Sequence, residues 1–232
     1  GPGGLTRALL FEGAKHVIAL ERDSRCLPAL DVVSAAYPQR LSIIHADALA
    51  TDWHNIIDGH SRPIYITANL PYGIATRLLI NWLETSPWPP WFDGMVLMFQ
   101  KEVAERIVAR PQTKPYGRLS VIAQWRTTPQ IALTLPPAAF TPPPKVASAV
   151  VTFAPIADPK PSCNVTTLGR LTAAAFGQRR KMLRTSLRQV VPHPELLLAK
   201  AELDPKLRSE QLSPQDFAHL AVCLDGETPE TA

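Results

Sequence analysis

Short apolar segments alternate with segments of helical spacing through the first 110 residues, and this alternation restricts the possible folds more than any other feature of the sequence. The apolar segments are rich in valine and isoleucine, as buried strands are, and cover residues 16–21, 41–46, 63–68 and 94–99. The helical segments are residues 5–12, 26–36, 75–84 and 101–110. Strands that alternate with helices form parallel crossover units, so we predict an open, doubly wound α/β sheet.

The pattern changes after residue 117. A further helix is predicted over residues 118–126, followed by strands over 130–135 and 146–153 with a proline-rich loop between them. Pro159 and Pro161 mark a linker. Beyond it only helices are predicted, at residues 165–176, 180–191, 194–202 and 214–224. We therefore predict an α/β domain over residues 1–158 and a small helical domain over residues 159–232.

Composition excludes several classes of protein. Hydrophobic residues make up 46% of the 232 residues and charged residues 19%, so the chain can bury a core and is not a disordered segment. Three widely spaced cysteines exclude a disulfide scaffold and a CxxC metal site. No apolar run approaches the ~18 residues of a membrane span, and we expect a soluble, cytoplasmic protein without a membrane partner. The opening Gly1-Pro2-Gly3-Gly4 lacks a methionine, so we expect a fragment with a missing upstream segment.

Positive charge is concentrated in one part of the chain. The net charge is +4, but residues 159–194 contain no acidic residue and seven basic ones, namely Lys160, Arg170, Arg179, Arg180, Lys181, Arg184 and Arg188. Such a block is typical of a surface that binds a polyanion, most commonly nucleic-acid phosphates. The alternative is a solvated helix face with no ligand.

Two acidic residues and a glycine-rich turn indicate a nucleotide-like cofactor. The turn from Gly1 to Gly4 precedes a helix, and Glu21 ends the next strand about 20 residues later, as in dinucleotide-binding folds. A carboxylate there can accept hydrogen bonds from both ribose hydroxyls. Asp47, after the following strand, could accept from an adenine amino group. The alternatives are an ordinary Gly-Pro turn or cloning remnant, and a capping or turn role for Asp47.

The tetrapeptide Asn69-Leu70-Pro71-Tyr72 follows the third apolar segment, where ligands of doubly wound sheets bind. The Asn69 side-chain oxygen and the carbonyl of Leu70 or Pro71 can accept from an exocyclic amino group, and the Tyr72 ring offers a stacking face. This set suits an adenine amino nitrogen. The alternative is a plain turn with a half-buried tyrosine.

With these motifs in order along the chain, the sequence resembles the ribosomal RNA adenine dimethyltransferase family. The motifs that carry the resemblance are GGLT at 3–6, DA at 47–48, NLPY at 69–72, QKEV at 100–103, YGRLSV at 116–121, FTPPPKV at 140–146 and RRKMLR at 179–184. The last two favour the bacterial small-subunit branch. Together, the seven motifs span nearly the whole chain.

The resemblance implies a Rossmann-like methyltransferase domain that binds S-adenosylmethionine, followed by a helical domain. It implies N6,N6-dimethylation of two adjacent adenosines in a small-subunit rRNA hairpin of the assembling 30S subunit, by a monomer. It places Gly1 and Gly3 near the methionine part of the cofactor, Glu21 at its ribose and Asp47 at its adenine. The segment from Asn69 to Tyr72 would hold the target base, with Asn69 also beside the cofactor.

This chemistry needs positioning more than a catalytic base. An adenine amino nitrogen is a poor nucleophile, and two fixed acceptors would favour its reactive, pyramidal form, while a sulfonium is already a good methyl donor. No metal is expected. Because the base must leave its stack, we predict an aromatic sandwich between Tyr72 and Phe140. Plain core packing is the alternative for Phe140.

The basic block is predicted to bind rRNA. On a helix over residues 180–191, Arg180, Arg184 and Arg188 would share one face above an apolar side made by Leu183, Leu187 and Val190 or Val191. The other cations expected on the same surface are Arg179, Lys181, Lys114, Arg118 and Lys145.

Several departures and rival functions remain open. The chain starts inside the glycine motif, so the family's first strand and N-terminal arm are absent from these residues, and Ala75, Arg77 and Ala147 differ from common family residues. Rivals within the family are the large-subunit resistance methyltransferases and mitochondrial transcription relatives. Outside it, a non-catalytic ribosome-assembly factor and a nicotinamide dehydrogenase remain, and binding of labelled S-adenosylmethionine but not NAD would separate these two.

Overall fold

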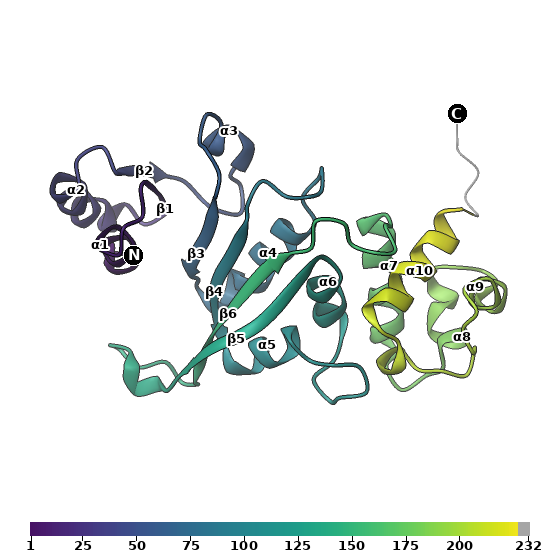
Figure 1. Ribbon diagram of the computed structural model, residues 1–232. Helices are drawn as coiled ribbons and strands as arrows, with labels where there is room; N and C mark the ends of the chain where they lie inside the picture. The colour runs from purple at the N-terminus through teal and green to yellow at the C-terminus, as the bar shows by residue number, and fades with distance from the viewer. Residues whose placement is uncertain (227–232) are drawn as a thin grey trace. The chain divides into compact units, whose positions relative to one another are not determined.

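Figure 1 shows a computed structural model of the protein, which describes residues 1–226. The chain forms two compact units, Gly1–Ser61 and Arg62–Ala232. The helices that follow Pro159 belong to the second unit, where they pack against the helix that precedes the last two strands. The domain boundary predicted after residue 158 stays a prediction.

The first unit pairs two parallel strands. Its elements are α1 (Gly4–Phe11), β1 (Val17–Glu21), α2 (Leu27–Ala36), β2 (Leu41–His45) and α3 (Trp53–Ile57). The strand register runs from Val17 opposite Leu41 to Glu21 opposite His45. Gly3 precedes α1 with φ +88°, and a Cβ there would lie 3.0 Å from the Leu30 side chain, so only glycine fits this turn.

The second unit contains a four-stranded mixed sheet. Its strands are β3 (Tyr65–Asn69), β4 (Gly94–Gln100), β5 (Thr127–Leu135) and β6 (Ser148–Pro155), in the spatial order β3-β4-β6-β5. β3 and β4 are parallel, as the sequence predicts, whereas β6 is antiparallel to β4 and β5. Asn69 therefore pairs with Met98, and Gln100 pairs with Ser148. The carboxyl ends of β3 and β4 and the start of β6 share one edge of the sheet.

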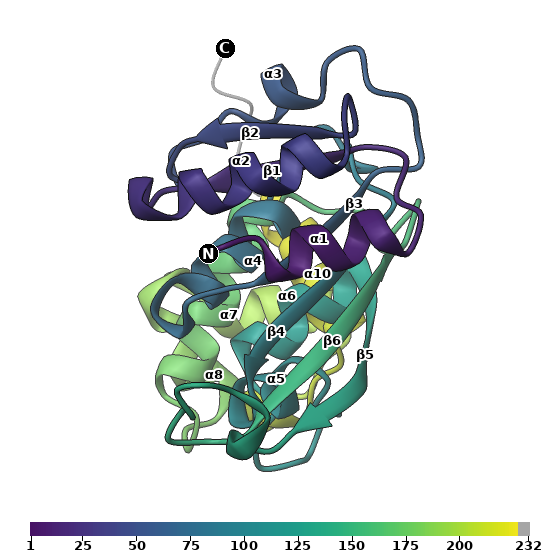
Figure 2. The ribbon, with the colours of Figure 1, turned by 90° about the vertical axis from the view of Figure 1, so that its left-hand side faces the viewer.

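Three helices cover one face of this sheet, as Figure 2 shows from the side. They are α4 (Tyr72–Leu83), α5 (Lys101–Ile107) and α6 (Arg118–Arg126). Apolar residues of these helices, among them Leu78 and Leu79, are fully buried together with Leu97 and Val151 of the strands. Burial of one such side chain stabilises the fold by roughly 1.5–3 kcal/mol.

The helical region packs on the far side of α6. It contains α7 (Val165–Gly177), α8 (Leu183–Ser186), α9 (Pro194–Lys200) and α10 (Pro214–Asp225). Its core is continuous with Trp125 of α6 and Tyr116, whose hydroxyl donates to the Leu212 carbonyl at 2.8 Å. α10 starts as predicted, because the Ser213 hydroxyl accepts from the Asp216 amide at 3.1 Å. None of the helices within residues 1–226 is long and apolar enough to span a bilayer.

The predicted helix over residues 180–191 is wrong. α7 ends at Gly177, Arg180 lies in the turn that follows, and α8 is followed directly by a short 3-10 turn, Leu187–Gln189. Met182 is extended because it forms a β-bridge with Arg208, and the Leu183 amide donates to the Leu207 carbonyl at 2.8 Å. Arg180 therefore does not share a helix face with Arg184 and Arg188. The apolar side is buried as predicted, through Leu183, Leu187 and Val191.

Candidate functional site

In the first unit, the glycine turn lies beside the Glu21 carboxylate. The Gly1 amino nitrogen contacts Glu21 Oε2, and Glu21 Oε1 accepts from the Asp23 amide at 2.7 Å. The Glu21 side chain is 13% exposed, so one carboxylate is held at the carboxyl end of β1 next to the turn. The structure thus places Gly1 beside Glu21, two of the residues that the sequence assigns to the cofactor.

Asp47 lies near the same edge, just after β2. Its Oδ1 accepts from the Leu49 amide at 2.9 Å, and its Oδ2 lies 3.3 Å from Arg22 Nη1. The hydrogen bond from the Leu49 amide gives Asp47 the turn role that the sequence allowed as an alternative to cofactor binding.

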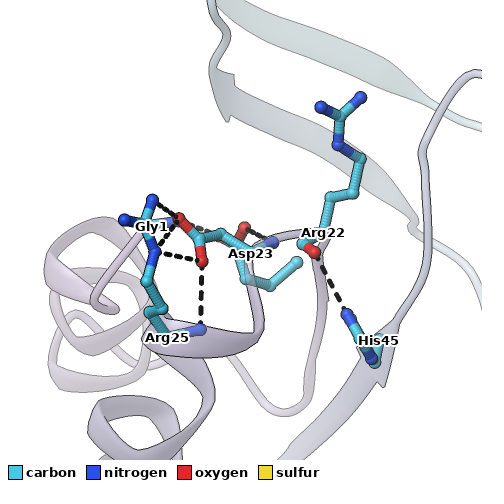
Figure 3. A network of polar contacts seen from close by, with 6 residues as sticks. Gly1, Arg22, Asp23, Arg25 and His45 are labelled. Carbon is cyan, nitrogen blue, oxygen red and sulfur yellow. Dashed lines mark hydrogen bonds and ion pairs between the residues drawn. The ribbon is translucent and has the colours of Figure 1, made fainter.

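Asp23 and Arg25, which no sequence motif indicated, form an ion pair at the short 3-10 turn just before α2 (Figure 3). Arg25 Nη2 lies 2.6 Å from Asp23 Oδ2, and the Arg25 amide donates to Asp23 Oδ1 at 3.0 Å. The hydrogen bond from the Arg25 side chain, and to a smaller extent the one from its backbone amide, lowers the pKa of Asp23 to about 2. Figure 3 also shows His45 Nε2 beside the Arg22 carbonyl, at 3.0 Å, which ties β2 to the segment after β1.

In the second unit, Asn69 ends β3 and α4 begins three residues later, at Tyr72. Asn69 is exposed, and its side chain makes no hydrogen bond within the described part of the chain. The Pro71 carbonyl accepts from the amides of Ile74 and Ala75 at 3.0 and 3.2 Å, so α4 occupies it. The Leu70 carbonyl receives no such bond from any residue between 1 and 226. Of the two carbonyls that the sequence left open, Leu70 has the free oxygen.

The Tyr72 ring is held at its hydroxyl. Tyr72 Oη lies 2.7 Å from Ser148 Oγ, and Ser148 is fully buried at the start of β6. Phe140 is half-buried in the loop that leads into β6. The structure places Phe140 in the loop at the same sheet edge as Tyr72, but it shows no ring contact of Phe140 with any described aromatic residue.

Cations from several segments line a pocket of about 430 Å³ beside α6. They are Arg106, Lys114, Arg118 and Arg179, and Thr76 of α4 lies on the same wall. Arg179 is partly committed to the fold, because its Nε lies 2.8 Å from Glu210 Oε2 and its Nη1 donates to the Lys114 carbonyl at 2.9 Å. Lys114 and Arg118 have no ion-pair partner among residues 1–226.

The remaining cations lie elsewhere on the surface. Arg180, Lys181 and Arg184 are exposed and form no ion pair in the part of the chain that the structure describes. Arg188 lies 3.9 Å from Glu195. Lys145 is exposed in the proline-rich loop. No group of three metal-ligating side chains occurs within residues 1–226.

A model of one protein family matches residues 1–225 of the chain, and its description is ribosomal RNA adenine dimethylase. The chain belongs to this family. It is therefore a ribosomal RNA adenine dimethyltransferase, and the resemblance drawn from the sequence motifs is confirmed.

Relatives of this dimethylase agree with the family. A protein of Sinorhizobium medicae, named ribosomal RNA small subunit methyltransferase A, is 55% identical over 224 residues, which cover 97% of this chain and 80% of the relative. A dimethyladenosine transferase from Plasmodium falciparum has a TM-score of 0.81 at 25% identity and covers 97% of this chain and 87% of its own. The 23S rRNA methyltransferase ErmE, at 23% identity and a TM-score of 0.66, shares the fold. The predicted methyltransferase fold class is thus confirmed.

Sequence reasoning missed two features of the dimethylase site. Arg106 lines the basic pocket, but in the sequence it stands among charged helix residues with no distinguishing spacing. Ser148 follows the proline-rich loop, and only the fold brings it to Tyr72, which is 76 residues away in the chain. No local pattern signals such a contact.

Proposed function

We propose that this dimethylase transfers methyl groups from S-adenosylmethionine to N6 of two adjacent adenosines in small-subunit ribosomal RNA. The observation that carries this proposal is the pair of free acceptors at the end of β3, the Asn69 side-chain oxygen and the Leu70 carbonyl. The name of the Sinorhizobium relative supports the small subunit as the target. We further propose that the substrate is rRNA within an assembling subunit and that the chain acts as a monomer.

The two acceptors match the two hydrogens of an adenine amino group. When both hydrogens are bound, the nitrogen lone pair is drawn out of conjugation with the ring and can attack. Pro71 has no amide hydrogen, and its carbonyl belongs to α4, so the acceptor before it stays fixed and unshared. The Tyr72 ring provides a face for the unstacked base, and we place Phe140 on the other face.

The first unit supplies groups that fit S-adenosylmethionine. The half-buried Glu21 carboxylate can accept from the ribose hydroxyls, and Asp47 can accept from the adenine amino group. Gly3 keeps the turn that brings the backbone of Gly1 beside Glu21. When bound, this cofactor supplies an electrophilic methyl group on a sulfonium, and Asn69 would also lie beside it. The protein's own groups then bind, orient and desolvate the reactants.

The exposed cations supply a surface for rRNA phosphates. We assign phosphate contacts to Arg118 in the 430 Å³ pocket and to the exposed cations Lys145, Arg180, Lys181, Arg184 and Arg188. Arg179 is half-buried against Glu210, so we give it the additional role of shaping the pocket.

Asn69→Ala tests the proposed function. Labelled S-adenosylmethionine is incubated with undermethylated small subunits or with large-subunit rRNA, and the nucleosides are analysed. We expect dimethyladenosine in small-subunit rRNA with the unaltered protein, and loss of transfer with unchanged rRNA binding in Asn69→Ala. Asn81→Ala is the control, because Asn81 is an exposed residue of α4 far along the helix from the turn.

Three results would contradict the proposal. Label in large-subunit rRNA alone would assign the protein to the resistance enzymes. Tight subunit binding without label would favour a non-catalytic assembly factor. Equal loss of binding and transfer in Asn69→Ala would remove Asn69 from the chemistry and make it a binding residue.

A further inference from the structure

The hydrogen bond between Tyr72 and Ser148 links the two segments that enclose the base in the proposed site. Tyr72 is the first residue of α4, two residues after the second free acceptor, Leu70, and Ser148 is the first residue of β6, directly after the loop that contains Phe140. The oxygens lie 2.7 Å apart. Ser148 Oγ has no other hydrogen-bond partner among residues 1–226, so this contact is its only use there.

The contact fixes the position of the Tyr72 ring. The hydroxyl oxygen lies on the axis of the Cβ–Cγ bond, so a hydrogen bond there restricts rotation about Cα–Cβ and keeps the ring in one place. Ser148 is itself rigid, because it is fully buried and paired with Gln100 of β4 and Leu135 of β5. The ring is therefore held against the sheet by a residue that belongs neither to α4 nor to the turn before it, which carries the acceptors Asn69 and Leu70.

The two methyl transfers place different demands on this ring. Before the first transfer, the amino group donates one hydrogen to Asn69 and one to the Leu70 carbonyl. In each transfer the N6–carbon bond forms, the sulfur–carbon bond breaks with its electron pair remaining on sulfur, and N6 then releases a proton to solvent. After the first transfer only one N–H remains, so one of the two acceptors loses its donor. The base is then positioned by one hydrogen bond and by its stacking contacts.

We infer that Ser148 is a positioning residue for the second methyl transfer, and that it acts by holding the Tyr72 ring in place against a base that has lost one of its two hydrogen bonds. This inference rests on the proposed function. It predicts that loss of the Ser148 contact slows the second transfer more than the first.

Single-turnover experiments on undermethylated small subunits test this inference. The variants are Ser148→Ala and Tyr72→Phe, which remove the same hydrogen bond from opposite sides, and the double variant. We expect the ratio of N6-monomethyladenosine to N6,N6-dimethyladenosine at a fixed time to rise about tenfold in each single variant, the rate factor that corresponds to one hydrogen bond. The double variant should equal the single variants, because the contact can be lost only once.

Two matched controls separate positioning from stability. Thr127→Val removes another buried hydroxyl from the same sheet, at the opposite end of β5, and Tyr65→Phe removes an exposed tyrosine hydroxyl at the start of β3. Both should keep the ratio of the unaltered protein. Thermal unfolding and rRNA binding are measured for every variant, and only the product ratio should separate the Ser148 and Tyr72 variants from the controls.

Failure of the inference is distinguishable from failure of the proposed function. If the unaltered protein dimethylates rRNA and the variants slow both transfers equally, or if the double variant is additive, the inference is overturned and the proposed function stands. An unchanged ratio of monomethyladenosine to dimethyladenosine in both single variants would also overturn the inference and leave the proposed function standing. If the unaltered protein transfers no methyl group to rRNA, both fail together.

Discussion

At the scale of single residues, the free acceptor at Leu70 follows from the proline after it. The Pro71 carbonyl takes the first hydrogen bonds of α4, and the Leu70 carbonyl is the last one before the helix. The ring of Pro71 fixes its φ, and this sets the residue at which the helix begins. Sequence alone predicted the turn, and the helix start decides which oxygen is free.

Cys163 is predicted to be an unreactive thiol. Burial, with a smaller contribution from the charge of Asp225, raises its pKa to about 12, although Arg126 acts in the opposite direction. The thiolate is the reactive form, so iodoacetamide at pH 8 should label Cys163 slowly in the folded protein and rapidly in urea. Peptide mass spectrometry resolves this cysteine from the other two. Rapid labelling of Cys163 under native conditions would show that the linker opens around it.

Asp23 is predicted to stabilise the first unit only above acidic pH. Its pKa is lowered from 3.8 to about 2 by the hydrogen bonds from Arg25, so the folded state favours the carboxylate. The resulting stability is complete above the unfolded value and is lost as the pH falls from about 4 towards 2. Asp23→Asn should therefore unfold more readily than the unaltered protein at pH 7, and the difference should shrink as the pH falls towards 2 and vanish only below it. A difference of constant size between pH 7 and pH 2 would assign the effect to something other than charge.

At the scale of elements, Arg126 joins the end of α4 to α6. Its Nη1 donates to the Leu83 and Thr85 carbonyls at 2.5 and 3.0 Å, and its guanidinium lies 4.4 Å from the centre of the Trp88 ring. Arg126 is only 7% exposed. Because the carbonyls at a helix C-terminus lack partners within the helix, this side chain completes α4 at the end opposite to the acceptor turn.

Replacement of Arg126 should therefore destabilise α4. We expect Arg126→Met to lower the free energy of unfolding by about 2 kcal/mol, the usual contribution of hydrogen bonds to a charged group. Arg126→Lys should recover only part of this, since the compact, strongly hydrated ammonium cannot stack on the Trp88 ring as the planar guanidinium does. Urea unfolding monitored by circular dichroism measures both. Equal stability of the methionine variant and the unaltered protein would mean that water satisfies the two carbonyls.

Elements with a strong local pattern were predictable, and elements set by distant contacts were not. The four apolar strands were found because valine and isoleucine cluster in them, and α10 because Ser213 and Asp216 cap it. The helix expected over residues 180–191 fails because the β-bridge from Met182 to Arg208 interrupts it, and no local spacing reveals that bridge. α3 was missed because it has five residues, too few for a periodic signal.

The site follows the same rule. The acceptors at Asn69 and Leu70 are contiguous and could be identified from the sequence. The pocket that combines Arg106 with Arg118 and Arg179 depends on how α5, α6 and the turn after α7 pack, so only some of its residues could be predicted from local patterns. The contact from Ser148 to Tyr72 depends on sheet register and was missed entirely.

At the scale of the whole molecule, the predicted ligands divide between the two units. Apart from Asn69, the groups assigned to the cofactor belong to residues 1–61, and the base acceptors and rRNA cations belong to the residues from 62 onward. Binding of rRNA and binding of cofactor therefore draw on separate parts of the sequence. Charge changes in the helical region should weaken rRNA binding without altering cofactor binding.

Reversal of two exposed cations tests this separation. Arg180 and Arg184 have no ion-pair partner within residues 1–226, so each is available to a phosphate, and each phosphate contact releases a counterion. In Arg180→Glu with Arg184→Glu we expect weaker small-subunit rRNA binding. The plot of log K against log salt should become shallower by about 2, the slope that two lost contacts carry. S-adenosylmethionine affinity should not change.

The control pair, Arg7→Glu with Lys15→Glu, alters net charge by the same amount on exposed residues of the first unit. If binding depended only on net charge, both pairs would lose affinity equally and show the same slope. A shallower slope in the Arg180 and Arg184 variant alone would locate the phosphate contacts in the turn and short helix that replace the predicted long one. An unchanged slope would exclude Arg180 and Arg184 as phosphate contacts and leave the pocket beside α6, with Lys145, Lys181 and Arg188, to account for the salt dependence.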